Sequence, residues 1–324
     1  MSVEIYRAST ASRVPACGCT NKCLEGRTMD QTEGQKEWGW FIVLYVFLAG
    51  LGGGAFLFSF IMIFLDKYTA VARIGALVGP LLVLLGSGML LLDLGSATRA
   101  YRLFTTPATL LSSWMIRGAW ILTAFIVLGL AYALPSFSLF SWLPWNQASG
   151  FGLGLGIAAA LLAIVTAVYP GLLLGVIKSI PLWNTSALPP LFFLSGLDTG
   201  LAFLVLMSVP FPSAVGADGL HLLGVFDAGL IVLLLVALGA YIEIVRQTGV
   251  TAAASIRLLT TPLFIGGVII AGLLLPLAIF ICGTYVSDVP SIRLLDGLAS
   301  LLILGGGLLL RLSVIRSGVR IVVR

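Results

Sequence analysis

The sequence has few charged residues and a single histidine. Only 10% of its 324 residues are Asp, Glu, Lys or Arg, whereas 59% are hydrophobic and the mean hydropathy is +1.11. Soluble globular proteins carry about 25% charged residues. This composition therefore excludes a soluble globular protein and predicts an integral membrane protein.

The lone histidine, His221, argues against a haem protein. A b-type haem in a membrane helix bundle commonly takes two histidines as axial ligands. The sequence also contains no P-loop, GxSxG or HExxH motif. We therefore expect no haem, and any electron transfer would need a diffusible or partner-held cofactor.

Eight apolar runs are long enough to cross a bilayer, which takes about 20 residues in a helix. The runs are continuous, whereas strands of a membrane barrel alternate apolar and polar residues. We therefore predict an all-α integral membrane protein. The expected spans cover residues 40–65, 70–94, 112–134, 151–177, 187–209, 221–245, 260–282 and 292–315.

Residues 1–37 form a polar tail without the apolar region of a secretory signal, so we expect the tail to be retained. It contains Cys17, Cys19 and Cys23. The spacing C-x-C-x3-C fits no common zinc or iron–sulfur pattern, and three thiolates leave a tetrahedral site one ligand short. A disordered or partner-bound tail and a metal site both remain open, and we assign no metal.

We expect residues 38–318 to form the membrane domain and residues 319–324 to form a basic C-terminal tail.

Basic residues are concentrated on one side of the predicted membrane domain, and short loops rich in Lys and Arg stay cytoplasmic. We therefore expect both termini in the cytoplasm of a bacterium or archaeon. The same asymmetry explains the net charge of +5, so we expect no nucleic-acid partner. The cytoplasmic set is Arg7, Arg13, Lys22, Arg27, Lys36, Arg99, Arg102, Lys178, Arg246, Arg257, Arg316, Arg320 and Arg324, and the opposite set is Lys67, Arg73 and Arg293.

Ionisable residues inside the apolar runs are functional candidates, because burying a charge in lipid is costly. Asp93 and Arg117 each lie within about two turns of the cytoplasmic surface. A structural ion pair and a proton-handling group remain alternatives there, with Arg99, Arg102 or Arg117 as the cation.

Three further carboxylates lie in later runs. Asp198, Asp227 and Asp296 step from the midplane to the outer surface, which permits a proton route. Arg311 also lies inside an apolar run.

The fourth run contains Tyr169, Pro170 and Gly171. Proline removes a backbone hydrogen bond and usually kinks a helix, so we expect the phenol to lie beside a local opening. At 1.5 Å per residue, Tyr169 lies roughly 14 Å from Lys178, near mid-depth. A quinone headgroup could reach it.

Several stretches together resemble the membrane subunit of the polysulfide reductase family (NrfD/PsrC type). They are YVFLAGLGGGAF, LLLDLGSATRAYRLF, SSWMIRGAWIL, YPGLLLGVIKSIPLWNTSALPPLFFLSGLDTG and GGGLLLRLSVIRSG, in this order over about residues 38–318.

This resemblance implies two four-helix groups and a haem-free anchor that binds menaquinone or ubiquinone. It also implies two partners, a four-cluster iron–sulfur subunit and a molybdopterin catalytic subunit. In the family a tyrosine of helix four lines the quinone pocket, and that tyrosine matches Tyr169. Some members of the family have an Asn/His pair at the start of helix one. This sequence has no such pair there, so Glu37, Trp38 or Tyr45 would replace it.

Our main hypothesis is therefore a quinone-reactive membrane anchor of an oxidoreductase complex. Tyr169 would bind a quinone carbonyl, and Asp93 would exchange protons under the influence of Arg117 or Arg311. Lys178 and Trp183 would help to form the cytoplasmic mouth. A secondary transporter that uses midplane carboxylates and a purely structural anchor remain the alternatives.

Overall fold

The computed structural model describes residues 39–93, 114–140, 142–211, 215–248, 250–283 and 289–319. These residues form helices joined by turns and loops, and no strand occurs among them. Trp38, Arg99, Arg102 and the tail that holds Cys17, Cys19 and Cys23 lie outside the described residues. The long helices are α2 (Trp40–Phe64), α3 (Thr69–Asp93), α5 (Trp114–Ala133), α6 (Gly150–Gly175), α7 (Leu188–Ser208), α8 (Ala217–Arg246) and α11 (Val289–Arg316). The shorter elements are α9 (Val250–Leu259), the π-helix η4 (Phe264–Leu274), α10 (Leu275–Gly283) and the 3₁₀ turns η2 (Leu134–Ser136) and η3 (Ser138–Phe140).

Eight helical segments in the described part of the chain are long and apolar enough to cross a membrane. Each begins and ends within a few residues of a predicted span, except that the seventh begins at Phe264, four residues late. The prediction of an all-α integral membrane protein is confirmed.

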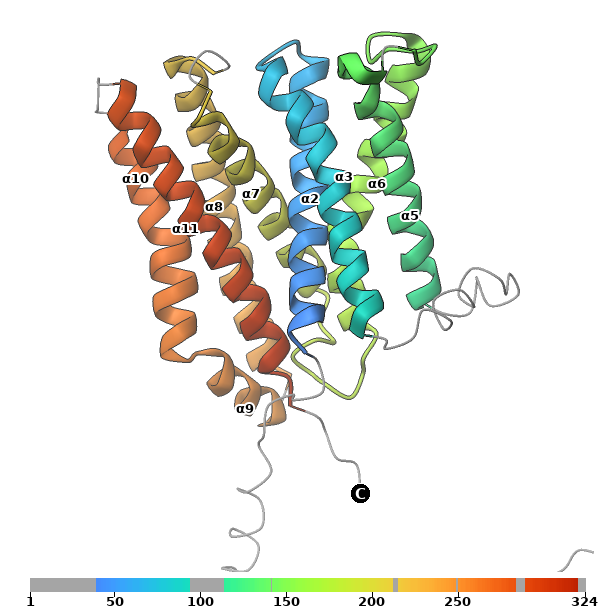
Figure 1. The fold of residues 1–324 in the computed structure, drawn as a ribbon. Coiled ribbons are helices and arrows are strands. Elements are labelled where there is room, and N and C mark those ends of the chain that lie inside the picture. Colours follow the sequence, from blue (N-terminus) through green and yellow to red (C-terminus); the bar gives the residue numbers. More distant parts are fainter. Residues whose placement is uncertain are drawn as a thin grey trace, which may run out of the picture. The chain divides into compact units, whose positions relative to one another are not determined.

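The spans form two groups of four (Figure 1). Helices α2, α3, α5 and α6 pack together, as do α7, α8, α11 and the continuous segment of η4 and α10. Helix α2 contacts α3 and α6 in its own group, and also α7 and α11 in the other group. It therefore lies at the junction between the groups.

Glycines in the middle of α2 allow this central position. A Cβ atom on Gly54 would overlap the carbonyl oxygen of Gly196 on α7, and one on Gly53 would lie 2.8 Å from the Ala163 oxygen on α6. A Cβ atom on Gly52 would lie 2.5 Å from the Gly79 oxygen on α3. Small residues let helix backbones approach closely in lipid. In this glycine segment, close packing explains the composition.

Helix α6 continues without a break through Pro170 to Gly175, so the predicted local opening at the proline is not seen as an interruption of the helix. Gly171 lies against the first turn of α7, where an added Cβ would come 2.6 Å from the Cα of Pro189. The Pro-Gly pair thus lets the start of the next span pack onto the end of α6.

The seventh span differs from an ordinary α-helix. Its first eleven residues, Phe264–Leu274, form the π-helix η4, and the ten-residue helix α9 precedes it. Gly272 in η4 meets Gly306 in α11, where an added Cβ on Gly272 would lie 2.6 Å from the Gly306 Cα. A uniformly apolar run contains no signal that distinguishes a π-helix from an α-helix, so the sequence did not predict it.

Candidate functional site

Tyr169 on α6 is buried against the beginning of α5. Its hydroxyl donates a hydrogen bond to the backbone oxygen of Trp114 at 3.1 Å. One turn further along α5, Gly118 leaves space for the phenol ring, which a Cβ atom there would overlap. The position of Tyr169 therefore depends on a backbone acceptor and on the absence of a side chain at residue 118.

Tyr45 on α2 places a second phenol close to the first. It is 1% exposed, and its hydroxyl is buried without a hydrogen-bond partner among the described residues. The Tyr45 phenol lies within electrostatic range of the Tyr169 phenol. A buried donor without an acceptor costs about 1–3 kcal/mol, so this hydroxyl calls for a water or a ligand oxygen.

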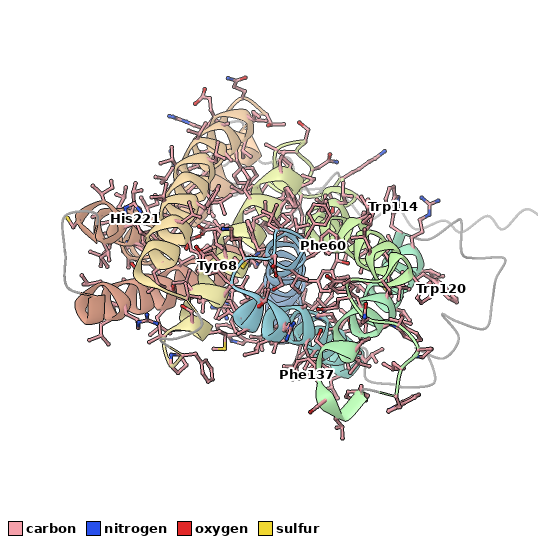
Figure 2. All side chains as sticks on the ribbon, turned by 90° about the horizontal axis from the view of Figure 1, so that it is seen from above. Phe60, Tyr68, Trp114, Trp120, Phe137 and His221 are labelled. Carbon is pink, nitrogen blue, oxygen red and sulfur yellow. The ribbon has the colours of Figure 1, made fainter. Side chains whose placement is uncertain are left out.

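Two cation–aromatic contacts lie at the same end of the spans. The guanidinium of Arg117 lies 5.0 Å from the ring of the exposed Trp114, and that of Arg316 lies 4.8 Å from the ring of Trp40. Figure 2 shows Trp114 and Trp120 on the outer side of the first helix group. Amphipathic side chains of this kind are common where a helix meets the membrane interface.

The remaining residues predicted for this site differ in their surroundings. Lys178 is exposed in the turn after α6. Trp183 is fully buried and donates to the backbone oxygen of Val314 at 2.9 Å, so its indole holds the end of α11 and has no open face. Asp93 is the last residue of α3, and its predicted partners Arg99 and Arg102 lie outside the described residues.

Arg311 is buried between α2, α7 and α11. Its Nη1 donates to the hydroxyl of Ser195 at 3.0 Å and to the oxygen of Gly307 at 2.9 Å, while Nε is buried without a partner among the described residues. The rings of Phe47 and Phe192 lie 5.5 and 5.7 Å from the guanidinium. An added Cβ on Gly50 would lie 2.5 Å from Nη2.

Asp198, Asp227 and Asp296 lie on α7, α8 and α11 and form a line of interacting carboxylates. Asp227 interacts electrostatically with both others, and Asp198 also interacts with Arg311. Both oxygens of Asp227 and one of Asp198 are buried without hydrogen-bond partners among the described residues. The structure thus brings together the three carboxylates that the sequence placed at successive depths.

The outer end of this line reaches the surface near His221. Asp296 and the exposed His221 line a cavity of about 20 Å³, which is room for about one water molecule. Asp296 also interacts with Arg293, whose guanidinium donates to the oxygens of Ser208 at 3.3 Å and Val215 at 3.0 Å. Figure 2 shows His221 on the side of the bundle away from Trp114.

Ser195, whose hydroxyl accepts a hydrogen bond from Arg311, was not among the residues predicted from the sequence. Ser195 precedes Asp198 by three residues, a spacing that places both on one helix face. That spacing could have identified it.

These features define the class of the protein, a multi-pass α-helical membrane protein with two buried polar clusters that share α2. The family model described as polysulphide reductase, NrfD, matches residues 28–323, so the chain belongs to this family. It is similar to a polysulfide reductase subunit of Wolinella succinogenes, with 33% identity over 181 residues. The match covers 51% of this chain, and the chain spans 56% of the length of that relative. The resemblance to the NrfD family is confirmed.

Replacing Arg311 with methionine should lower the free energy of unfolding by about 1–3 kcal/mol, because the Ser195 hydroxyl and the Gly307 oxygen would lose their buried donor and Asp198 would lose a nearby positive charge. Combining Arg311→Met with Asp198→Asn should recover part of the loss. Thermal unfolding in detergent measures both effects, with Arg316→Met, an exposed cation on the same helix, as the control. Equal stability of Arg311→Met and Arg316→Met would contradict the stabilising role of the buried Arg311 side chain.

Proposed function

We propose that this chain is the quinone-binding membrane subunit of a multi-subunit reductase, with menaquinone or ubiquinone as the bound quinone. Membership of the NrfD family supports this proposal, and so does the relative, which is one subunit of a polysulfide reductase. The buried, unpartnered hydroxyl of Tyr45 beside Tyr169 is the observation that carries it.

The two phenols provide different hydrogen-bonding capacities. Tyr45 has a free donor, which suits a quinone carbonyl. The proton of Tyr169 is held by the Trp114 oxygen, so its own oxygen remains an acceptor, which suits a quinol hydroxyl. A quinone supplies two-electron, two-proton redox chemistry. Tyr45 and Tyr169 would therefore distinguish and orient its two redox forms.

Proton exchange at this site is assigned to groups at the same end of the spans. Asp93 ends α3 and Arg117 lies in the first turn of α5, so both lie at the end of the first group where Tyr169 is fixed. In this proposal Asp93 accepts or delivers protons and Arg117 stabilises its charged form, while Lys178 lies at the aqueous mouth. The burial of Trp183 gives it a structural part in this arrangement.

Replacing Tyr45 with phenylalanine should weaken quinone binding about tenfold, because one hydrogen bond is lost. The ligand-free protein should be as stable as the wild type or more stable, since an unsatisfied buried hydroxyl is removed. Titration with a quinone analogue and thermal unfolding measure the two effects.

Tyr241→Phe is the matched control, because its buried hydroxyl already donates to the Leu182 oxygen at 2.9 Å. It should lose about 1 kcal/mol of stability and keep quinone affinity. Unchanged affinity in both Tyr45→Phe and Tyr169→Phe would exclude the site and favour a purely structural anchor.

The proposed partners are a four-cluster iron–sulfur subunit and a molybdopterin catalytic subunit on the cytoplasmic side of the inner membrane. The excess of Lys and Arg at the Trp40 end supports this side. Purification of the native complex should yield both subunits. An engineered cysteine in the N-terminal tail should resist an impermeant reagent on intact cells, and efficient labelling from outside would reverse the orientation.

We also propose that Asp198, Asp227 and Asp296 carry protons between the middle of the membrane and the surface near His221. The unpartnered oxygens of Asp227 and the water-sized cavity at Asp296 support this route. Arg311 lies at the inner end of this route, within electrostatic range of Asp198.

Replacing Asp227 with asparagine should reduce proton transfer at least tenfold in liposomes that contain the complex, because the middle carrier loses its titratable group. Quinol oxidation in detergent should continue, because Asp227 lies on α8 in the other helix group. A pH-sensitive dye inside the liposomes reports proton transfer, and Glu243→Gln, an exposed carboxylate on the same helix, is the control. Proton transfer at the control rate would exclude the route.

A further inference from the structure

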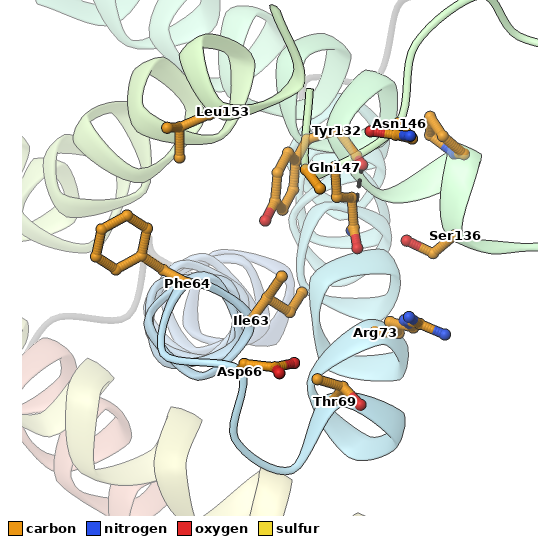
Figure 3. A pocket seen from close by; sticks show the side chains of 12 residues that line it. Ile63, Phe64, Asp66, Thr69, Arg73, Tyr132, Ser136, Asn146, Gln147 and Leu153 are labelled. Atoms are coloured by element: carbon orange, nitrogen blue, oxygen red, sulfur yellow. Dashed lines mark hydrogen bonds between the residues drawn. The ribbon is translucent and has the colours of Figure 1, made fainter. Parts of the chain in front are cut away.

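A second cavity lies at the end of the first helix group opposite Tyr169. It has a volume of about 680 Å³, which is in the usual range for small-molecule sites of about 300–1,000 Å³. The ends of α2 and α5, the beginnings of α3 and α6, and the loop after η3 form its walls (Figure 3). Its lining residues are Ile63, Phe64, Asp66, Thr69, Arg73, Tyr132, Pro135, Ser136, Asn146, Gln147, Ala148 and Leu153.

The lining is divided into an apolar and a polar part. Figure 3 shows Phe64 and Leu153 on one side, while Asp66, Thr69 and Arg73 lie along another. Phe64 is 64% exposed, and its ring stacks on that of Phe60, with 6.2 Å between the centroids. An apolar surface thus continues from the cavity along α2. An amphipathic ligand suits such a lining.

The loop that carries Asp66 is held in an unusual conformation. Asp66 and Tyr68 have φ angles of 53° and 50°. These angles lie in the left-handed region, which residues other than glycine rarely adopt. The ring of Tyr68 packs against Gly219 of α8, where an added Cβ would lie 2.5 Å from the ring. Strained residues of this kind persist where surrounding contacts hold them, and they are common at ligand sites.

The opposite wall is also fixed by hydrogen bonds. The side-chain nitrogen of Trp145 donates to the oxygen of Ala131 at 3.1 Å, and that of Gln147 donates to the oxygen of Tyr132 at 3.3 Å. These bonds attach the loop to the end of α5. Side-chain packing on one side of the cavity and hydrogen bonds on the other thus hold its walls in place.

Polar groups in the cavity have capacity for a ligand. The hydroxyl of Ser136 is buried without a partner among the described residues. Asp66 and Arg73 both line the cavity, and the described residues include no ion pair between them. The lining therefore offers one negative and one positive group, with a net charge of zero.

We propose that this cavity binds the headgroup of a zwitterionic phospholipid. Arg73 binds the phosphate, Asp66 binds the ammonium group, and Phe64 and Leu153 contact the acyl chains. The cavity lies at the ends of four spans, at the depth of lipid headgroups. A quinone would leave both charges unmatched, and an anionic lipid would leave Asp66 without a cation.

The purified complex, stripped of lipid in detergent, is titrated with short-chain phosphatidylethanolamine and phosphatidylglycerol of equal acyl length. The wild type should bind phosphatidylethanolamine about tenfold more tightly, because only this headgroup pairs with both charges. Asp66→Asn should remove this preference, and Arg73→Gln should weaken both lipids about tenfold. Lys67→Gln, an exposed cation on the same loop outside the cavity, should behave as the wild type.

Asparagine tolerates the left-handed region, so Asp66→Asn should preserve the loop. As an independent measurement, Ser136→Cys in a variant without native cysteines reports occupancy through its reaction with a maleimide. Phosphatidylethanolamine should protect this cysteine more strongly than phosphatidylglycerol. Equal wild-type affinities for the two lipids would overturn the proposal. So would an equal loss in Lys67→Gln and Arg73→Gln, or displacement of the lipid by a quinone analogue.

Discussion

The close approach of α2 and α7 is the constraint on which the other contacts depend. Gly54 meets the Gly196 oxygen so closely that a single added carbon would overlap it. Lipid tails are as apolar as leucine, so helices in a bilayer associate through close packing and hydrogen bonds. A larger residue at position 54 would therefore separate the two helix groups. It would also move α2 away from Arg311, which Gly50 now accommodates.

This shared helix connects two regions with different chemistry. Tyr45 and Gly50 are five residues apart on α2, or about 7.5 Å along the helix axis. The first belongs to the phenol pair with Tyr169, and the second contacts the guanidinium that accompanies Asp198. The phenol pair is thus joined to the carboxylate line by a rigid element with little room for movement. A displacement of α2 would therefore change the position of Tyr45 and the contact between Gly50 and Arg311 together.

The sequence predicts the spans well because each is a long apolar run, a property of a single segment. Tyr169 stays a prediction, which rests on the adjacent Pro170 and Gly171 and on the family resemblance. The bond from Trp183 to Val314 and that from Arg311 to Ser195 join residues 131 and 116 positions apart. The spacing of a single sequence indicates the face of a helix and leaves its partner undetermined. For that reason Trp183 was predicted at an opening, whereas it is buried.

The connection between α6 and α7 shows where one helix group ends and the other begins. Helix α6 ends at Gly175, and the following turn contributes Leu182 and Trp183 to bonds with Tyr241 of α8 and Val314 of α11. These hydrogen bonds attach the turn to the second helix group, although it precedes α7 in the sequence. If the protein were expressed as two complementary fragments, a division near Val176 would keep these bonds within one fragment. A division at Leu188 would leave Tyr241 and Val314 to recover their partners from a separate fragment.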